Sequence, residues 1–67
     1  MYTDALRESR KRAGMTLEQV AEHLNISKMA VSNWELGKSP APNLSRLIQL
    51  ADLYDTSIDK LVGRKKA

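Results

Sequence analysis

The stretch that most constrains the fold is residues 16–36, TLEQVAEHLNISKMAVSNWEL, whose pattern indicates two short helices joined by a tight turn. Thr16 and Gln19 have the spacing of a capping box, in which each side chain satisfies a free backbone N–H at the start of a helix. The residues that follow share one apolar stripe: Val20, Ala21 and Leu24. Asn25 tolerates the left-handed conformation that ends helices, so we expect the first helix to stop there.

The second helix of the pair is predicted to start after Ser27, a favoured N-cap residue. Its inward positions are apolar: Ala30, Val31 and Trp34. Another face is polar: Lys28, Ser32 and Asn33. A helix with a polar outer face that leaves a tight turn is typical of a DNA recognition helix.

Before this pair, the pattern predicts a helix from a cap at Thr3 to about Ala13. The inward positions of that helix are Leu6, Ser9 or Arg10, and Ala13, so Arg10 lies on the stripe that should face the core. A buried guanidinium requires an anionic partner. Glu35, at the end of the second helix of the pair, is the candidate, so we expect a structural ion pair between Arg10 and Glu35.

After the pair, the prolines of the linker at residues 39–42 disfavour a helix, and Asn43 is expected to cap the next one. That helix should run to about Tyr54 with its apolar stripe turned inward. The stripe consists of Leu44, Leu47, Ile48, Ala51 and Tyr54, and Leu50 and Leu53 widen it. A last short helix follows a cap at Ser57 and ends at Gly63.

The five helices predict an all-α, compact domain spanning residues 1–63, followed by a basic C-terminal tail at residues 64–67. The tail accounts for the net positive charge of the chain. Lys and Arg number 11 against 8 Asp and Glu, a net charge of +3, but three of the basic residues lie in the tail. Residues 1–63 therefore carry eight charges of each sign, and net charge gives only weak support for nucleic-acid binding.

Several functional classes are disfavoured. The chain has no cysteine, and no apolar run approaches the roughly 20 residues that span a bilayer. We therefore expect a cytoplasmic protein with neither a signal peptide nor a membrane segment. His23 has no second metal-ligating residue at a suitable spacing, and no set of nucleophile, base and orienting residue is present. We expect no metal, no cofactor and no enzymatic activity.

Residues 16–36 resemble the helix-turn-helix of lambda-type phage repressors and Cro proteins (Cro/C1-type), the xenobiotic-response-element class. The resemblance continues beyond the motif. Residues 33–38, NWELGK, are similar to the ending in which the family has an apolar or aromatic residue, Glu, a variable residue, Gly and Lys. Residues 57–61, SIDKL, are similar to the family's closing Ser-Leu-Asp-x-Leu. The match runs from about residue 6 to 63 and implies the five-helix fold of a lambda-repressor-like DNA-binding domain.

The resemblance places four residues on the surface that reads bases: Lys28, Met29, Ser32 and Asn33. Asn33 can pair with adenine through two hydrogen bonds, Lys28 can donate to guanine or to phosphate, and Ser32 suits either base type. Met29 has two interpretations: its thioether contacts thymine methyl groups, or it packs against the end of the helix.

The resemblance also implies phosphate contacts near the start of the first helix of the pair, where free N–H groups attract an anion. The candidates are Thr16, Leu17, Lys38, Ser39 and Arg10. At Leu17 the family usually has Gln, so only the backbone donor remains there. Arg10 has two interpretations, a structural pair with Glu35 alone or that pair together with a phosphate contact.

The family implies a sequence-specific regulator of transcription of repressor/Cro type, with activation as the alternative to repression, that binds double-stranded DNA as a homodimer on a pseudo-palindrome. A bacterial or phage-encoded protein at the nucleoid, without a small-molecule effector, is expected. The dimer face should include Thr56, Ile58 and Leu61, which could equally be internal core. An alternative function is a protein-interaction module, such as an antitoxin or a regulator's partner, with a binding patch of three apolar residues: Leu17, Met29 and Leu36.

Overall fold

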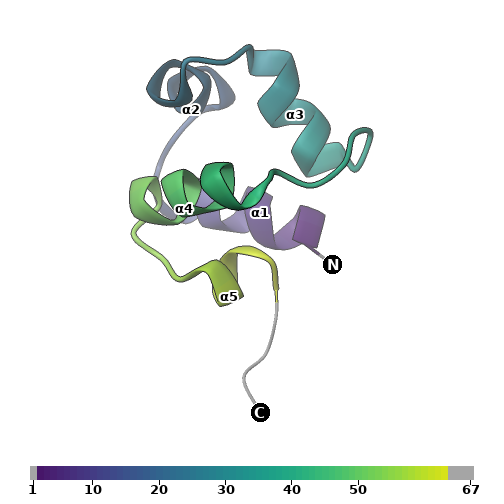
Figure 1. Ribbon diagram of the computed structural model, residues 1–67. Helices are drawn as coiled ribbons and strands as arrows, with labels where there is room; N and C mark the ends of the chain where they lie inside the picture. Colours follow the sequence, from purple (N-terminus) through teal and green to yellow (C-terminus); the bar gives the residue numbers. More distant parts are fainter. Residues whose placement is uncertain (1, 64–67) are drawn as a thin grey trace.

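The computed structural model describes residues 2–63, and the basic tail predicted at 64–67 lies outside this part of the chain. Within the described residues the fold is all-helical, as predicted, with five helices and no strand (Figure 1). Their bounds are α1 Tyr2–Arg12, α2 Leu17–Leu24, α3 Lys28–Leu36, α4 Leu44–Leu53 and α5 Ile58–Leu61. Each is too short, and too polar, to cross a membrane.

The helices begin where side chains satisfy their first free N–H groups. Each predicted N-cap of the last four helices accepts a hydrogen bond from the backbone N–H three residues later: Thr16, Ser27, Asn43 and Ser57. The predicted ends of α2 and α3 are also confirmed, since Asn25 and Gly37 have left-handed φ angles of 56° and 72°. The cap expected at Thr3 is wrong, because α1 already begins at Tyr2 and includes Thr3.

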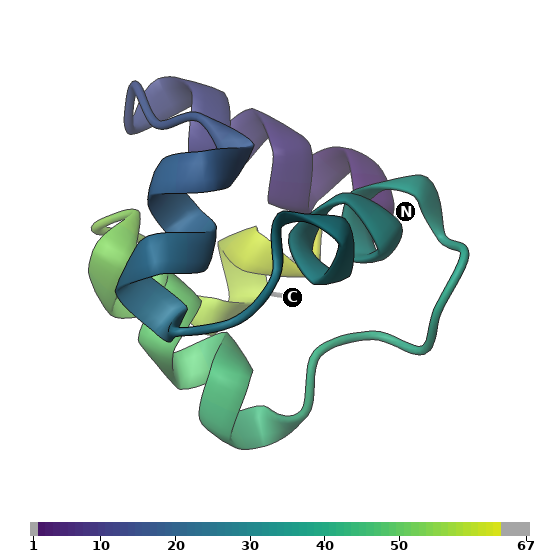
Figure 2. The ribbon, with the colours of Figure 1, turned by 90° about the horizontal axis from the view of Figure 1, so that it is seen from above.

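The helices form two groups at opposite ends of a shared core. In Figure 1, α2 and α3 lie at the top, α4 crosses the middle in front of α1, and α5 lies below them. The backbone of α3 packs against α1 and α2, whereas α5 packs against α1 and α4. Seen from above, the segment between α3 and α4 forms a wide outer loop (Figure 2). The helix-turn-helix pair thus occupies one end of the molecule.

The core draws on all five helices. Its buried residues are Leu6, Val20, Ala21, Leu24, Val31, Leu50, Ala51, Tyr54 and Leu61. Tyr54 is a packing residue, as expected, and burial in the core raises the pKa of its phenol above the ordinary value, with the Glu35 carboxylate adding to the effect. Ala13, which was expected to face inward, is exposed and lies in the turn after α1.

The inward stripe predicted for α4 is partly wrong. Leu50 is 1% exposed, but Leu44 and Ile48 are 66% and 46% exposed. The positions that meet the core are Leu47, Leu50, Ala51 and Tyr54, which are spaced i, i+3, i+4 and i+7. Ile48 is rotated about 100° from Leu47 around the helix, so it points away from this face. Apolar residues therefore occupy a wider part of the α4 surface than the part that contacts the core.

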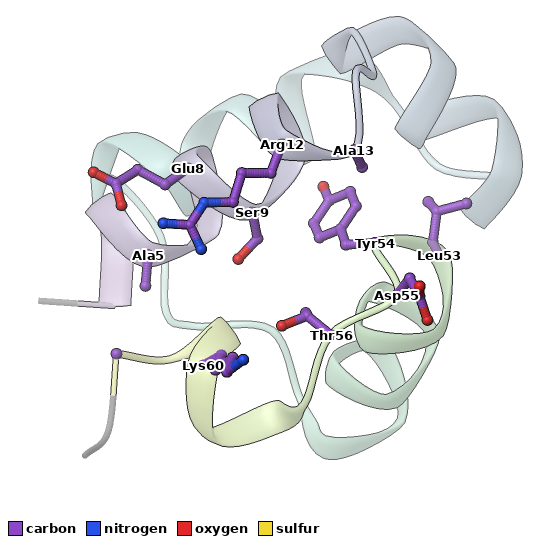
Figure 3. Close-up of a pocket in the computed structure, with 11 residues that line it drawn as sticks. Ala5, Glu8, Ser9, Arg12, Ala13, Leu53, Tyr54, Asp55, Thr56 and Lys60 are labelled. Atoms are coloured by element: carbon purple, nitrogen blue, oxygen red, sulfur yellow. The ribbon is translucent and has the colours of Figure 1, made fainter.

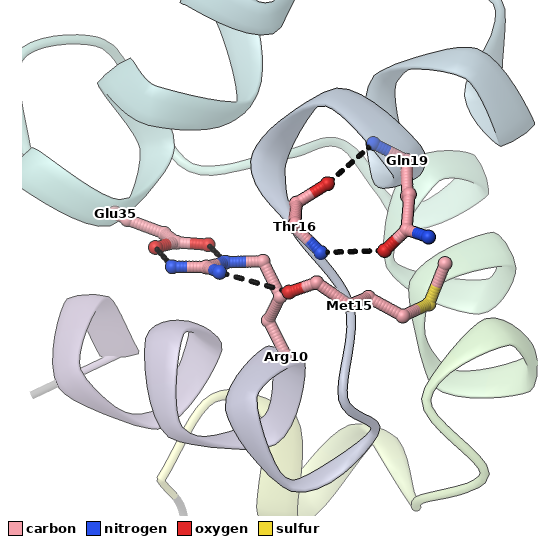
Figure 4. Close-up of polar contacts among 5 residues, drawn as sticks. All are labelled: Arg10, Met15, Thr16, Gln19 and Glu35. Atoms are coloured by element: carbon pink, nitrogen blue, oxygen red, sulfur yellow. Dashed lines mark hydrogen bonds and ion pairs between the residues drawn. The ribbon is translucent and has the colours of Figure 1, made fainter.

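An ion pair joins α1 to α3, as the sequence predicts. Arg10 Nε donates to Glu35 Oε2 at 2.7 Å, and Arg10 Nη2 donates to Glu35 Oε1 at 3.0 Å (Figure 4). The third nitrogen, Nη1, donates to the carbonyl oxygen of Met15 at 2.9 Å, in the loop before α2. The hydrogen bond to Glu35 raises the pKa of Arg10, although burial opposes this, so the guanidinium stays charged. One side chain therefore fixes three segments relative to each other.

The two faces of α4 predict different costs for the same substitution. Leu50→Ala should lower the free energy of unfolding by about 2–5 kcal/mol, because it removes a buried side chain and leaves a cavity. Leu44→Ala, on the exposed face, should change that of the monomer by less than about 0.5 kcal/mol. Urea unfolding of both variants measures the difference, and equal losses would contradict this assignment of the two faces.

The ion pair predicts strong coupling between its two residues. Their side chains are 13% and 7% exposed, so Arg10→Met would leave a buried carboxylate without its partner at a cost of about 3–5 kcal/mol. In the double variant Arg10→Met/Glu35→Leu, the free energy of unfolding should recover most of that loss. A double-mutant cycle by urea unfolding measures the coupling. Additive losses would show that the pair is not coupled.

Candidate nucleic-acid interface

The turn between α2 and α3 is held by its own backbone. Asn25, in the left-handed conformation, directs its N–H to the carbonyl oxygens of Ala21 and Glu22, and the Ile26 N–H donates to Ala21 at 3.0 Å. Ser27 then caps α3 by accepting from the Ala30 N–H at 3.1 Å. Only residues 25–27 separate the two helices. The direction of α3 is therefore set by α2 over a short connection.

The four predicted base-reading residues lie together on α3, away from its buried side. Lys28, Met29, Ser32 and Asn33 occupy neighbouring positions on one helix face, because they are spaced i, i+1, i+4 and i+5. Met29 is 66% exposed, so its thioether does not pack into the protein. Within residues 2–63 no hydrogen bond engages the Ser32 hydroxyl or the Asn33 amide. This face offers free donors, free acceptors and one apolar group.

Lys28 has an acidic neighbour that the sequence did not indicate. Its Nζ lies 3.8 Å from Oε1 of Glu18, in the first turn of α2. Both side chains are mostly exposed, and such a pair contributes little to stability. The ammonium group can therefore leave Glu18 for another anion at small cost.

The predicted phosphate contacts at the start of α2 have different environments. The capping box uses the Thr16 N–H, which donates to Gln19 Oε1 at 2.9 Å, while the Thr16 hydroxyl oxygen accepts from the Gln19 N–H at 3.1 Å (Figure 4). The first N–H groups inside the helix, those of Leu17 and Glu18, have no partner in the helix itself. The Leu17 side chain packs against the core, which explains an apolar residue at this position.

The remaining phosphate candidates differ in access. Lys38 is exposed, and Ser39 is half-buried with its hydroxyl donating to the Pro40 carbonyl oxygen at 3.3 Å. Arg10 is 13% exposed, and all three of its guanidinium nitrogens donate within the protein. Its environment favours the first of its two interpretations, a structural pair.

One residue of this region was missed by the sequence analysis. Arg46, in the first turn of α4, donates from Nη1 to the carbonyl oxygen of Leu24 at 3.0 Å. Leu24 is the last residue of α2, so Arg46 reaches the turn of the helix-turn-helix from outside it. The only signal in the sequence is a cation three residues after the cap Asn43, which does not identify its distant partner.

The residues expected at a dimer face separate into two groups. Thr56 and Ile58 are half-buried, whereas Leu61 is 0% exposed and packs in the core. Leu61 was therefore wrongly included, and its alternative assignment as internal core is correct.

A groove of about 670 Å³ lies between α1 and the α4–α5 connection (Figure 3). Its lining carries two acidic and two basic residues, Glu8, Asp55, Arg12 and Lys60. Among the described residues, no group of three or more His, Cys, Asp or Glu side chains could hold a metal ion. The groove is on the side of α5, whereas α3 lies at the other end of the molecule (Figure 1).

Comparisons with known proteins agree with this architecture. The family model described as helix-turn-helix matches residues 6–61. The chain is 41% identical over 63 residues to the uncharacterized HTH-type transcriptional regulator YobD of Bacillus subtilis, covering 94% of this chain and 55% of YobD. It is 41% identical over 66 residues to the HTH-type transcriptional regulator AnsR of the same organism, covering 98% of this chain and 56% of AnsR.

A phage protein and a solved structure extend the comparison. Identity is 33% over 61 residues to the cryptic phage CTXphi transcriptional repressor RstR of Vibrio cholerae, covering 91% of this chain and 54% of RstR. The crystal structure of a transcriptional regulator from Listeria innocua superposes with a TM-score of 0.84 at 31% identity, covering all of this chain and 62% of that one. The chain spans about half the length of the curated relatives it matches. By sequence and by fold, it belongs to the Cro/C1-type helix-turn-helix family.

Proposed function

We propose that this chain binds double-stranded DNA in a sequence-specific manner and regulates transcription, with α3 lying in the major groove. The observation that carries the proposal is the free face of α3, where Lys28, Met29, Ser32 and Asn33 lie side by side without strong internal partners. The short turn and the Arg10–Glu35 pair hold α3 rigidly, and a reading helix requires such support. Membership of a family whose relatives are named as transcriptional regulators and repressors supports the same function.

Each residue of the α3 face has a chemical role in the proposal. The Asn33 amide pairs with adenine N6 and N7, Lys28 donates to guanine or to phosphate, and Ser32 adds a hydrogen bond to either base type. The exposed Met29 contacts thymine methyl groups. The assignment is independent of net charge, since residues 1–63 are electrically balanced.

Phosphate contacts position α3 in the groove. The Leu17 N–H and the Thr16 hydroxyl hydrogen lie at the start of α2, where the helix dipole also favours an anion. Lys38 and Ser39 follow the end of α3 and supply a second contact region. Arg10 is left out of this set because its nitrogens are already engaged.

Binding to a pseudo-palindrome requires a homodimer with a two-fold axis, and we propose that the second copy packs on the outer face of α4. Leu44 and Ile48 form an exposed apolar pair there, one helical turn apart. Ser45 and Gln49, exposed beside them on α4, are uncharged, whereas Asp52, one turn after Ile48, is exposed and acidic, so the two-fold axis would lie nearer Leu44, away from Asp52. Thr56 and Ile58 remain candidates for its margin.

Other features complete the proposal. Residues 1–63 form the DNA-binding domain, and the basic tail at 64–67 follows it. The protein acts in the cytoplasm at the nucleoid, without enzymatic activity and without a small-molecule effector. A protein-interaction module is disfavoured, because Leu17 packs against the core and is lost from the apolar patch that such a module would use.

The proposal predicts one result in a selection from random duplexes. The chain should enrich a pseudo-palindrome with half-sites about one helical turn apart, and its affinity should fall steeply with salt. Met29→Ala should relax the preference at one A·T step, because a methyl contact is lost, whereas Lys38→Ala should lower the salt slope by about one without changing the preferred sequence. No enriched sequence would refute the function. A uniform loss of affinity in Met29→Ala would refute the role of that residue alone.

The dimer face predicts that a charge at Leu44 separates the copies. Leu44→Asp should weaken self-association about tenfold or more without unfolding the domain, since Asp is favoured in the first turn of a helix. Leu36→Lys is the control, because it puts a charge on an apolar residue that is 58% exposed and belongs to α3, not to α4. Sedimentation equilibrium measures both variants. Equal effects, or none at Leu44, would exclude the outer face of α4.

A further inference from the structure

The Arg46 side chain links α4 to the end of α2, directly before the turn of the helix-turn-helix. Its Nη1 donates to the Leu24 carbonyl oxygen at 3.0 Å and to Gln49 Oε1 at 3.1 Å. Leu24 ends α2, and its carbonyl belongs to the last turn, where no partner within the helix is available. The closest helix packing of α4 is with α5. Within residues 2–63, this is the hydrogen bond that joins α4 to the helix pair.

The position of Arg46 is locally unfavourable. It is the third residue of α4, directly at the positive end of the helix dipole, where an acidic residue or Gln is preferred. The equivalent position of α2 holds Gln19, which completes a capping box, whereas Arg46 gives only its backbone N–H to the cap Asn43. A residue that opposes the local preference has a reason elsewhere in the fold. Here that reason is the carbonyl end of α2, where a cation is favoured.

We propose that Arg46 is a positioning residue for DNA recognition: it fixes the α2–α3 turn relative to α4 and so sets where α3 meets the bases. The bond acts on the residue directly before the turn at 25–27, so its loss changes the direction of α3 more than the stability of the core. Base contacts carry the sequence information, while phosphate contacts carry none directly. This inference rests on the proposed reading of bases by α3. Loss of Arg46 should therefore reduce sequence preference more than general affinity.

The test uses Arg46→Met, which keeps much of the side-chain stem and removes the guanidinium. Its matched control is Arg7→Met, because Arg7 is exposed and has only a long contact of 3.9 Å to Asp4. For both variants and Arg46→Lys, the ratio of affinities for the selected palindrome and for an unrelated duplex is measured at several salt concentrations. Amide hydrogen exchange of the free protein is measured alongside, at Ile26 in the turn and at Leu50 in the core.

In Arg46→Met we expect the affinity ratio to fall about tenfold with an unchanged salt slope, as for the loss of one charged hydrogen bond. Exchange at Ile26 should accelerate about tenfold, with less change at Leu50 and no change in Arg7→Met. Arg46→Lys should restore part of the ratio. A slope lowered by about one with an unchanged ratio would identify a phosphate ligand and overturn the inference. Unchanged exchange at Ile26 would also overturn it.

Exchange in the free protein separates this inference from the proposed function. If the unsubstituted chain preferred no sequence, base reading by α3 would be wrong, and the exchange rates at Ile26 would still decide whether Arg46 holds the turn. If the chain preferred a palindrome and Arg46→Met left the affinity ratio intact, only the role of Arg46 would be wrong.

Discussion

The guanidinium of Arg10 is the group on which the arrangement of the helix pair depends. Three of its nitrogens bind Glu35 on α3 and the Met15 carbonyl before α2, so the two helices are fixed to α1 at separate points. Removing two charges from water is expensive, and the short, two-point contact with Glu35 is the geometry that offsets this cost. A small domain has a small core, and a directional contact specifies an orientation that apolar packing alone leaves loose.

The surface that we propose to face DNA also depends on placed groups. Residues 1–63 have no surplus of positive charge, and Lys28 lies beside Glu18. Attraction to DNA must therefore come from where groups lie: the free N–H groups of α2, Lys38 after α3, and the donors on α3 itself. In this account, specificity comes from placement more than from charge.

Features governed by local rules could be predicted from the sequence. The caps at Thr16, Ser27, Asn43 and Ser57, and the left-handed Asn25 and Gly37, follow from side-chain and backbone chemistry within one turn. The Arg10–Glu35 pair could also be predicted, because a cation on an inward stripe requires an anionic partner. Features that depend on how the helices pack could not be predicted from the sequence. The apolar pattern of α4 does not indicate which of its six apolar residues the core covers, so Leu44 and Ile48 were placed wrongly, and no local rule links Arg46 to Leu24.

The central claim is that the outer face of α3 contacts bases, and NMR of the chain with its selected palindrome tests it most directly. The Met29 methyl group and the Asn33 side-chain amide are two probes on that face. Glu8 and Lys60, which line the groove between α1 and the α4–α5 connection, serve as an internal reference. The account predicts large shifts and intermolecular contacts from Met29 to thymine methyl groups, with the groove unchanged. Contacts confined to the groove, with Met29 and Asn33 unperturbed, would contradict it.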